Sequence, residues 1–113
     1  ADYIFIDDAA EAFLKALHSS DAVGRVIPIG NGDTVSVNEL ADLIIKLTGS
    51  RSHKRYSFMR KGESPLSIYI DTSMAKGLFN FKAKVSLEEG LKRTIPYYRE
   101  KLALEEEKRE VLA

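Results

Sequence analysis

The sequence has 113 residues and a formal net charge of zero, with 17 basic and 17 acidic side chains. This length predicts a single domain over residues 1–113, and a hydrophobic content of 44% excludes a disordered chain. The absence of cysteine, with two histidines, excludes disulfides and a structural zinc site. The neutral charge argues against nucleic acid as a partner. With no signal peptide and no apolar run near the ~20 residues of a membrane-spanning helix, we expect a cytoplasmic protein.

The chain begins with the pattern of a strand followed by a helix. Residues 3–6 form an apolar run that predicts a strand, and apolar residues three and four apart predict a helix over residues 9–17. Between them, Asp7 and Asp8 could bind a metal or act as a base, but adjacent carboxylates before a helix are usually caps. His18 follows the helix and suits its negative end, which favours a structural role.

A second unit of the same kind follows. Residues 25–29 predict a strand whose proline favours the edge of a sheet, and residues 30–33 predict a turn. Ser36 and Glu39 have the spacing of a capping box, which predicts a helix that ends at Gly49.

The second half predicts shorter elements and one long helix. Short strands are expected at residues 56–58 and 66–70. A short helix, capped by Asp71 or Thr72, is expected after the second of these strands. A second capping box at residues 86–89 opens the long helix, which Pro96 should kink. The expected fold class is therefore α/β (α+β): a small mixed domain of short strands with three to four helices and a long kinked C-terminal helix.

Two patterns imitate known catalytic motifs. The turn Gly30-Asn31-Gly32 suggests a dinucleotide-binding loop, but the third glycine is missing and the helix begins later, so a plain turn is favoured. Tyr97 and Lys101 have the Tyr-x-x-x-Lys spacing of a catalytic pair, but no nucleotide-binding fold precedes them. We therefore predict no catalytic residue in this chain.

The positive charge concentrates in the middle, where residues 51–84 carry 8 basic and 2 acidic groups. Such a segment is either a solvated basic loop or an attractor for a compact anion. Within it, Arg60, Gly62 and Glu63 stand in one four-residue loop. A guanidinium suits a phosphate and a carboxylate can accept ribose hydroxyls, so this loop is the candidate substrate-binding site.

Five segments, taken together and in order, resemble a known enzyme family. Residues 2–12 resemble its Arg-Asp-Tyr-Ile-His-Val-Asp-Asp-Val-Ala-Glu-Ala segment, and residues 29–41 its Asn-Ile-Gly-x-Gly turn and Ser-Val-x-Glu-Leu helix start. Residues 71–81 resemble its Asp-x-Ser-Lys-Ala stretch, and residues 85–91 and 94–100 its closing helix. The chain thus resembles the C-terminal part of the extended short-chain dehydrogenase/reductase family, the NAD-dependent nucleotide-sugar epimerases and dehydratases such as UDP-glucose 4-epimerase.

The resemblance implies a division of labour. In this family an N-terminal Rossmann portion, which has no counterpart in this chain, binds NAD and holds the catalytic residues. The matched portion binds the nucleotide-diphosphate sugar, and its Arg-x-Gly-Asp/Glu loop, matched by Arg60, Gly62 and Glu63, contacts the diphosphate and ribose. The implied function is a nucleotide-sugar-binding portion that is not catalytic by itself and binds no cofactor. A protein-interaction or self-association module derived from the same fold remains the alternative.

Three departures from the family pattern concern this loop and its surroundings. Ala1 stands where the family has a second phosphate-binding arginine, and Pro28 replaces the usual asparagine before Ile-Gly. One extra residue lies between Gly62 and Asp71. Since half of the phosphate clamp is missing, we expect only weak binding of a nucleotide sugar by the chain alone.

Overall fold

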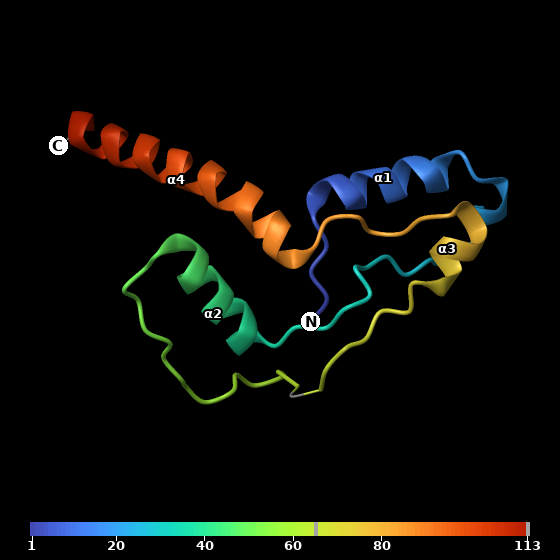
Figure 1. Ribbon diagram of the computed structural model, residues 1–113, viewed down its shortest axis with the longest axis horizontal. Coiled ribbons are helices and arrows are strands. Elements are labelled where there is room, and N and C mark those ends of the chain that lie inside the picture. The colour runs from blue at the N-terminus through green and yellow to red at the C-terminus, as the bar shows by residue number, and fades with distance from the viewer. Residues whose placement is uncertain (65, 113) are drawn as a thin grey trace.

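The computed structural model describes residues 1–64 and 66–112. Its elements, in chain order, are α1 (Ile6–Leu17), the 3₁₀ turn η1 (Ser20–Ala22), α2 (Val37–Thr48), α3 (Ser73–Phe79) and α4 (Leu87–Leu112). Helices were predicted in all four α-helical regions. Figure 1 shows α1 and α3 at one end of the molecule, joined by long extended segments to α2 and α4 at the other end.

The predicted strands are not present, and this part of the fold-class prediction was wrong. Within residues 1–64 and 66–112 the structure contains no strand, and Ile6 already belongs to α1. The segments are extended, but a strand also requires a neighbour that takes its backbone hydrogen bonds along several residues. Ala1 and Val35 come nearest to this arrangement, since each backbone amino group donates to the other's carbonyl oxygen at 2.9 Å.

The helix ends follow local sequence rules in most places. In α2 the hydroxyl of Ser36 accepts from the Glu39 amide, the Glu39 carboxylate accepts from the Ser36 amide, and Gly49 ends the helix with φ of 64°. At the start of α4, Ser86 accepts from the Glu89 amide while the Glu89 side chain pairs with Arg93 instead. The first capping box is thus confirmed, and the second forms only in its Ser86 half.

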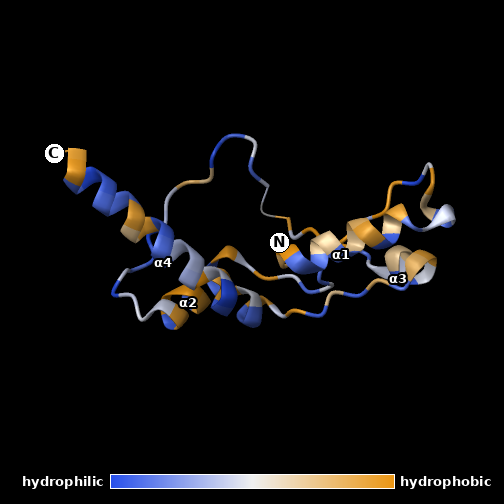
Figure 2. Ribbon diagram, turned by 90° about the horizontal axis from the view of Figure 1, so that it is seen from above, coloured by the Kyte–Doolittle hydropathy of each residue, from blue (hydrophilic) through white to orange (hydrophobic). Residues whose placement is uncertain are grey.

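The core is small for a chain of this length. Ala12, Ala75 and Phe81 are the buried hydrophobic residues, and partly buried side chains pack against them: Ile4, Ile27, Ile29, Phe79 and Ala83. The radius of gyration of 18.1 Å exceeds the ~13 Å that a compact domain of this length has. In Figure 2 apolar residues gather on α1 and α3, whereas much of α4 is polar. The molecule is therefore an open assembly of helices with one small core.

Pro96 lies within α4, as predicted, and the kink expected there stays a prediction. None of the helices in the described part of the chain combines the length and the apolar character needed to cross a membrane.

Candidate functional site

The candidate loop is a tight turn. The Glu63 amide donates to the Arg60 carbonyl oxygen at 3.0 Å, which closes the turn across four residues. Gly62, the third of them, has φ of +92°, the backbone conformation that a type II turn demands at this position and that glycine adopts without strain. The predicted glycine therefore sets the shape of the loop.

Within the turn, the structure brings Arg60 and Glu63 directly together. One carboxylate oxygen of Glu63 accepts from Arg60 Nε at 2.7 Å, and the other accepts from the Arg60 backbone amide at 2.8 Å. The Arg60 side chain is 88% exposed, so this ion pair is weak and easily exchanged for another partner. The two terminal guanidinium nitrogens have no partner within residues 1–64 and 66–112, and they can still meet a phosphate.

The neighbouring positive charge is partly neutralised. Lys54 donates to the Asp42 carboxylate at 2.9 Å, and this hydrogen bond raises the pKa of Lys54 above its usual value. Ala1 contributes its amino terminus and carbonyl to the pairing with Val35 and has no cationic side chain. Arg60 and Lys61 are the basic residues of the turn itself, and both are exposed.

The glycine turn at residues 30–32 is already occupied by a carboxylate. Asp2 accepts from the Asn31 amide at 2.7 Å and from the Gly32 amide at 2.9 Å. A Cβ on Gly30 would lie 2.6 Å from the same carboxylate, which explains the glycine there. Because Asp2 uses these amides and would repel a pyrophosphate, the turn does not fit the phosphates of NAD. The plain-turn interpretation agrees with this geometry.

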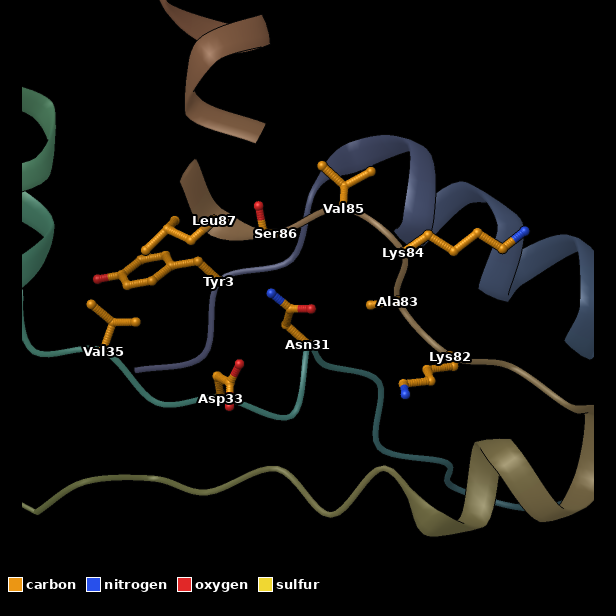
Figure 3. A pocket seen from close by; sticks show the side chains of 10 residues that line it. All are labelled: Tyr3, Asn31, Asp33, Val35, Lys82, Ala83, Lys84, Val85, Ser86 and Leu87. Carbon is orange, nitrogen blue, oxygen red and sulfur yellow. The ribbon is translucent and has the colours of Figure 1, made fainter. Parts of the chain in front are cut away.

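A cavity that the sequence did not reveal lies beside this turn. It measures about 320 Å³ and is shown in Figure 3. Asn31 and Asp33 extend from the turn on one side, while Lys82 and Ser86 come from the segment that leads into α4. Arg60, Gly62 and Glu63 are not among its lining residues. The signal in the sequence is the turn at residues 30–33, whose polar side chains predict a turn but not a cavity.

The position of Asp8 differs from the one predicted. It was expected to cap the first helix, but it caps nothing there: the N-cap of α1 is Phe5, without a side-chain hydrogen bond. Asp8 is 3% exposed and accepts from the backbone amides of Lys84 and Val85, at 3.1 and 2.9 Å. Its role is thus to hold a segment far along the chain, although the preference for a structural over a metal-binding role agrees with these bonds.

The other residues singled out in the sequence lie at helix positions. Tyr97 and Lys101 both lie in α4, where Tyr97 packs edge to face on Tyr98 with ring centroids 5.1 Å apart. His18 is the C-cap residue of α1. In residues 1–64 and 66–112, no three acidic or histidine side chains come together as metal ligands would.

Comparisons with known proteins agree with the resemblance in the sequence. The chain is similar to UDP-glucose 4-epimerase from Thermotoga maritima, whose crystal structure was determined with UDP-glucose. The two sequences are 38% identical and the two structures superpose with a TM-score of 0.82, over 89% of this chain and 32% of that one. The chain is homologous to one part of the NAD-dependent epimerase/dehydratase enzymes. No protein-family model matches the sequence.

Two curated epimerases extend this relationship. The chain is 30% identical to UDP-glucuronate 4-epimerase of Thermodesulfobacterium geofontis, over 91% of this chain and 31% of the relative. It is 36% identical to a putative UDP-glucose 4-epimerase of Methanocaldococcus jannaschii, over 83% of this chain and 29% of the relative. The chain therefore spans about a third of the length of these epimerases.

Proposed function

We propose that this chain is the nucleotide-sugar-binding portion of an NAD-dependent nucleotide-sugar epimerase or dehydratase and is not catalytic by itself. The observation that carries the proposal is the likeness, over most of the chain, to an epimerase whose structure was determined with UDP-glucose. The exposed Arg60–Glu63 turn supplies a fitting chemistry, since it presents a guanidinium and a carboxylate beside each other. A cytoplasmic location belongs to the same proposal.

The turn would bind a nucleoside diphosphate in two parts. The terminal nitrogens of Arg60 donate to phosphate oxygens, and the carboxylate of Glu63 accepts from ribose hydroxyls. Because Glu63 also holds Arg60 Nε, binding exchanges part of an exposed ion pair for contacts with the ligand. NAD would be held by the portion of the enzyme that this chain does not match. The reaction itself then needs residues outside this chain.

A second candidate function rests on a different observation. Large apolar side chains are exposed on α1 and on the segment that follows η1, namely Phe13, Leu17, Val23 and Val26. Such a surface fits a protein-interaction or self-association module, which would bind no nucleotide. The two functions are separated by whether the Arg60–Glu63 turn binds a nucleotide.

The experiment is an NMR titration of the 113-residue chain with UDP. We expect weak binding, in the millimolar range (~4 kcal/mol), because Ala1 cannot supply a second arginine. Chemical shifts should change around residues 60–63, and Arg60→Ala should weaken binding by about ten- to a hundredfold, the worth of a charge-assisted hydrogen bond.

Arg51→Ala is the matched control, since it removes an exposed positive charge from the same segment but outside the turn. It should weaken binding only slightly, through charge screened by salt. Equal effects of the two substitutions would reduce the turn to a general basic patch, and an absence of any shift at millimolar UDP would favour the interaction module.

A further inference from the structure

The cavity beside the glycine turn takes no part in the proposed function. Asn31 and Asp33 lie on one of its walls, and Lys82 and Ser86 lie on the other (Figure 3). The Arg60–Glu63 turn contributes no residue to it. Its volume of about 320 Å³ is at the lower end of the range for small-molecule sites, which is about 300–1,000 Å³. A ligand that fills this cavity is therefore small.

Each wall of the cavity is held by a carboxylate from the start of the chain. Asp2 accepts from the backbone amides of residues 31 and 32, at 2.7 and 2.9 Å. Asp8 accepts from the backbone amides of residues 84 and 85, at 3.1 and 2.9 Å. Hydrogen bonds to an ionised acceptor are stronger than neutral ones, so both walls keep their positions without a ligand. Binding to such a preorganised site costs little ordering of the chain.

Opposite charges line the cavity from its two walls. Asp33 brings a carboxylate and Lys82 an ammonium group, and neither side chain has an ion-pair partner in residues 1–64 and 66–112. Lys84, the other lysine of the lining, pairs with Glu11 at 3.3 Å and points away from the cavity in Figure 3. A simple anion is repelled by Asp33 and a simple cation by Lys82. A molecule that carries both charges is attracted by both groups.

The other end of the cavity is apolar. Figure 3 shows the ring of Tyr3 beside the side chains of Val35 and Leu87. The hydroxyl oxygen of Ser86 accepts from the Glu89 amide at 3.2 Å, and its hydrogen can still be donated to a ligand. The cavity thus combines a charged end with an apolar end, as sites for small amphipathic molecules do.

We propose that this cavity binds a small apolar α-amino acid in its free, zwitterionic form. The ammonium group of the ligand donates to Asp33, and its carboxylate accepts from Lys82 and Ser86. The apolar side chain of the ligand lies against Tyr3 and Leu87. None of these residues belongs to the turn proposed to bind the nucleotide, so the inference is independent of the proposed function.

The test is an NMR titration of the 113-residue chain with L-leucine, followed at the amides of residues 31–35 and 82–87. We expect saturable shifts in the millimolar range, because Asp33 and Lys82 are exposed and solvent weakens their attraction for the ligand. N-acetyl-L-leucine lacks the ammonium group and L-leucinamide lacks the carboxylate. Each of these two molecules should bind about tenfold more weakly than L-leucine.

Two substitutions assign the charged ends of the ligand. Asp33→Asn should weaken the binding of L-leucine by about tenfold but should not weaken that of N-acetyl-L-leucine, which has no ammonium group. Lys82→Gln should likewise weaken the binding of L-leucine but not that of L-leucinamide. Asp21→Asn in η1 and Lys101→Gln in α4 are the matched controls, since they remove the same charges outside the cavity. Both controls should leave the affinity for L-leucine unchanged.

Three results would overturn the proposal. One is the absence of saturable shifts at residues 31–35 and 82–87 with millimolar L-leucine. Another is equal affinity for the three ligands, which is measured on the parent chain and does not depend on how the variants fold. The last is an equal loss of affinity in the cavity variants and their controls, because the effect would then come from the general charge of the chain.

Discussion

Two aspartates near the start of the chain organise distant segments through backbone amides. Asp2 accepts from the amides of Asn31 and Gly32, and Asp8 accepts from those of Lys84 and Val85. A buried carboxylate is tolerated only where donors satisfy it, and here the donors are main-chain groups. Backbone amides belong to every residue type, so their pairing with Asp8 leaves no trace in the sequence. The expectation of a helix cap failed for that reason.

Replacing Asp8 should destabilise the chain more than replacing its neighbour. Asp8→Ala leaves two amides without their acceptor and should lower the free energy of unfolding by about 2–4 kcal/mol. Asp8→Asn should cost less, since one amide oxygen can still accept both bonds, as one carboxylate oxygen does now. Asp7→Ala, at an exposed position, should cost below about 1 kcal/mol. Chemical denaturation of the three variants measures these differences, and equal losses for Asp7→Ala and Asp8→Ala would contradict the role of Asp8.

Two glycines should respond to alanine with opposite sign. At Gly30 a Cβ would lie 2.6 Å from the Asp2 carboxylate and 2.9 Å from Ile70, so Gly30→Ala should destabilise the chain by about 1–3 kcal/mol. At Gly77, within α3, a Cβ meets nothing within 4 Å, and Gly77→Ala should stabilise it by about 0.5–1 kcal/mol. Thermal unfolding gives both values. A loss at Gly77 or no effect at Gly30 would show that the local packing differs.

At the scale of elements, helices were predictable and strands were not. The helix over Val37–Thr48 carries its own start signal in Ser36 and Glu39 and its own stop signal in Gly49. A strand has no such autonomy, because its hydrogen bonds come from a neighbour elsewhere. Residues 3–5 and 26–29 lie outside the helices, as a strand would require, but no strand adjoins them in the described residues. For the candidate site, the sequence predicted the members of the turn but not the pairing of Arg60 with Glu63.

The capping box of α2 should make stability depend on pH. Hydrogen bonding from the Ser36 backbone amide lowers the pKa of Glu39 below 4.5. A carboxyl group whose pKa is lower in the folded chain contributes stability above its unfolded pKa, and this contribution disappears as the pH falls through the folded value. Stability should therefore decrease as the pH drops below 4.5. Glu11 and Asp71, whose pKa values are also lowered, add to the same decrease.

Glu39→Gln isolates the contribution of the box, because glutamine can also accept from the Ser36 amide but does not titrate. The variant should lose less stability than the parent chain between pH 6 and pH 3, as measured by urea denaturation at each pH. A parallel decrease for the parent chain and Glu39→Gln would exclude Glu39 as a source.

At the scale of the whole molecule, the helices surround a core that is too small to bury their apolar faces. The core joins α1, α3 and the segment before α4, while α2 contacts α4 through the Arg99 guanidinium, which donates to the Thr48 carbonyl at 3.0 Å. Composition could not reveal this, since a hydrophobic content of 44% is ordinary for a compact domain. The number of apolar residues is sufficient, but Phe13, Leu17 and others face solvent. The size of the core depends on which way the apolar side chains point, and composition does not show this.

The outer end of α4, residues 101–112, lies in solvent. Residues 101–112 are all exposed, and Arg99 makes the last hydrogen bond from α4 to another element in the described part of the chain. In Figure 1 this end of the helix extends away from the rest of the molecule. Because no side chain in this segment is buried, a chain that stops at Glu100 should keep its free energy of unfolding within about 0.5 kcal/mol. Its radius of gyration, by small-angle X-ray scattering, should fall below that of the parent chain. A loss of several kcal/mol on truncation would show that residues 101–112 pack on the body of the molecule, and an unchanged radius would show that they do not extend from it.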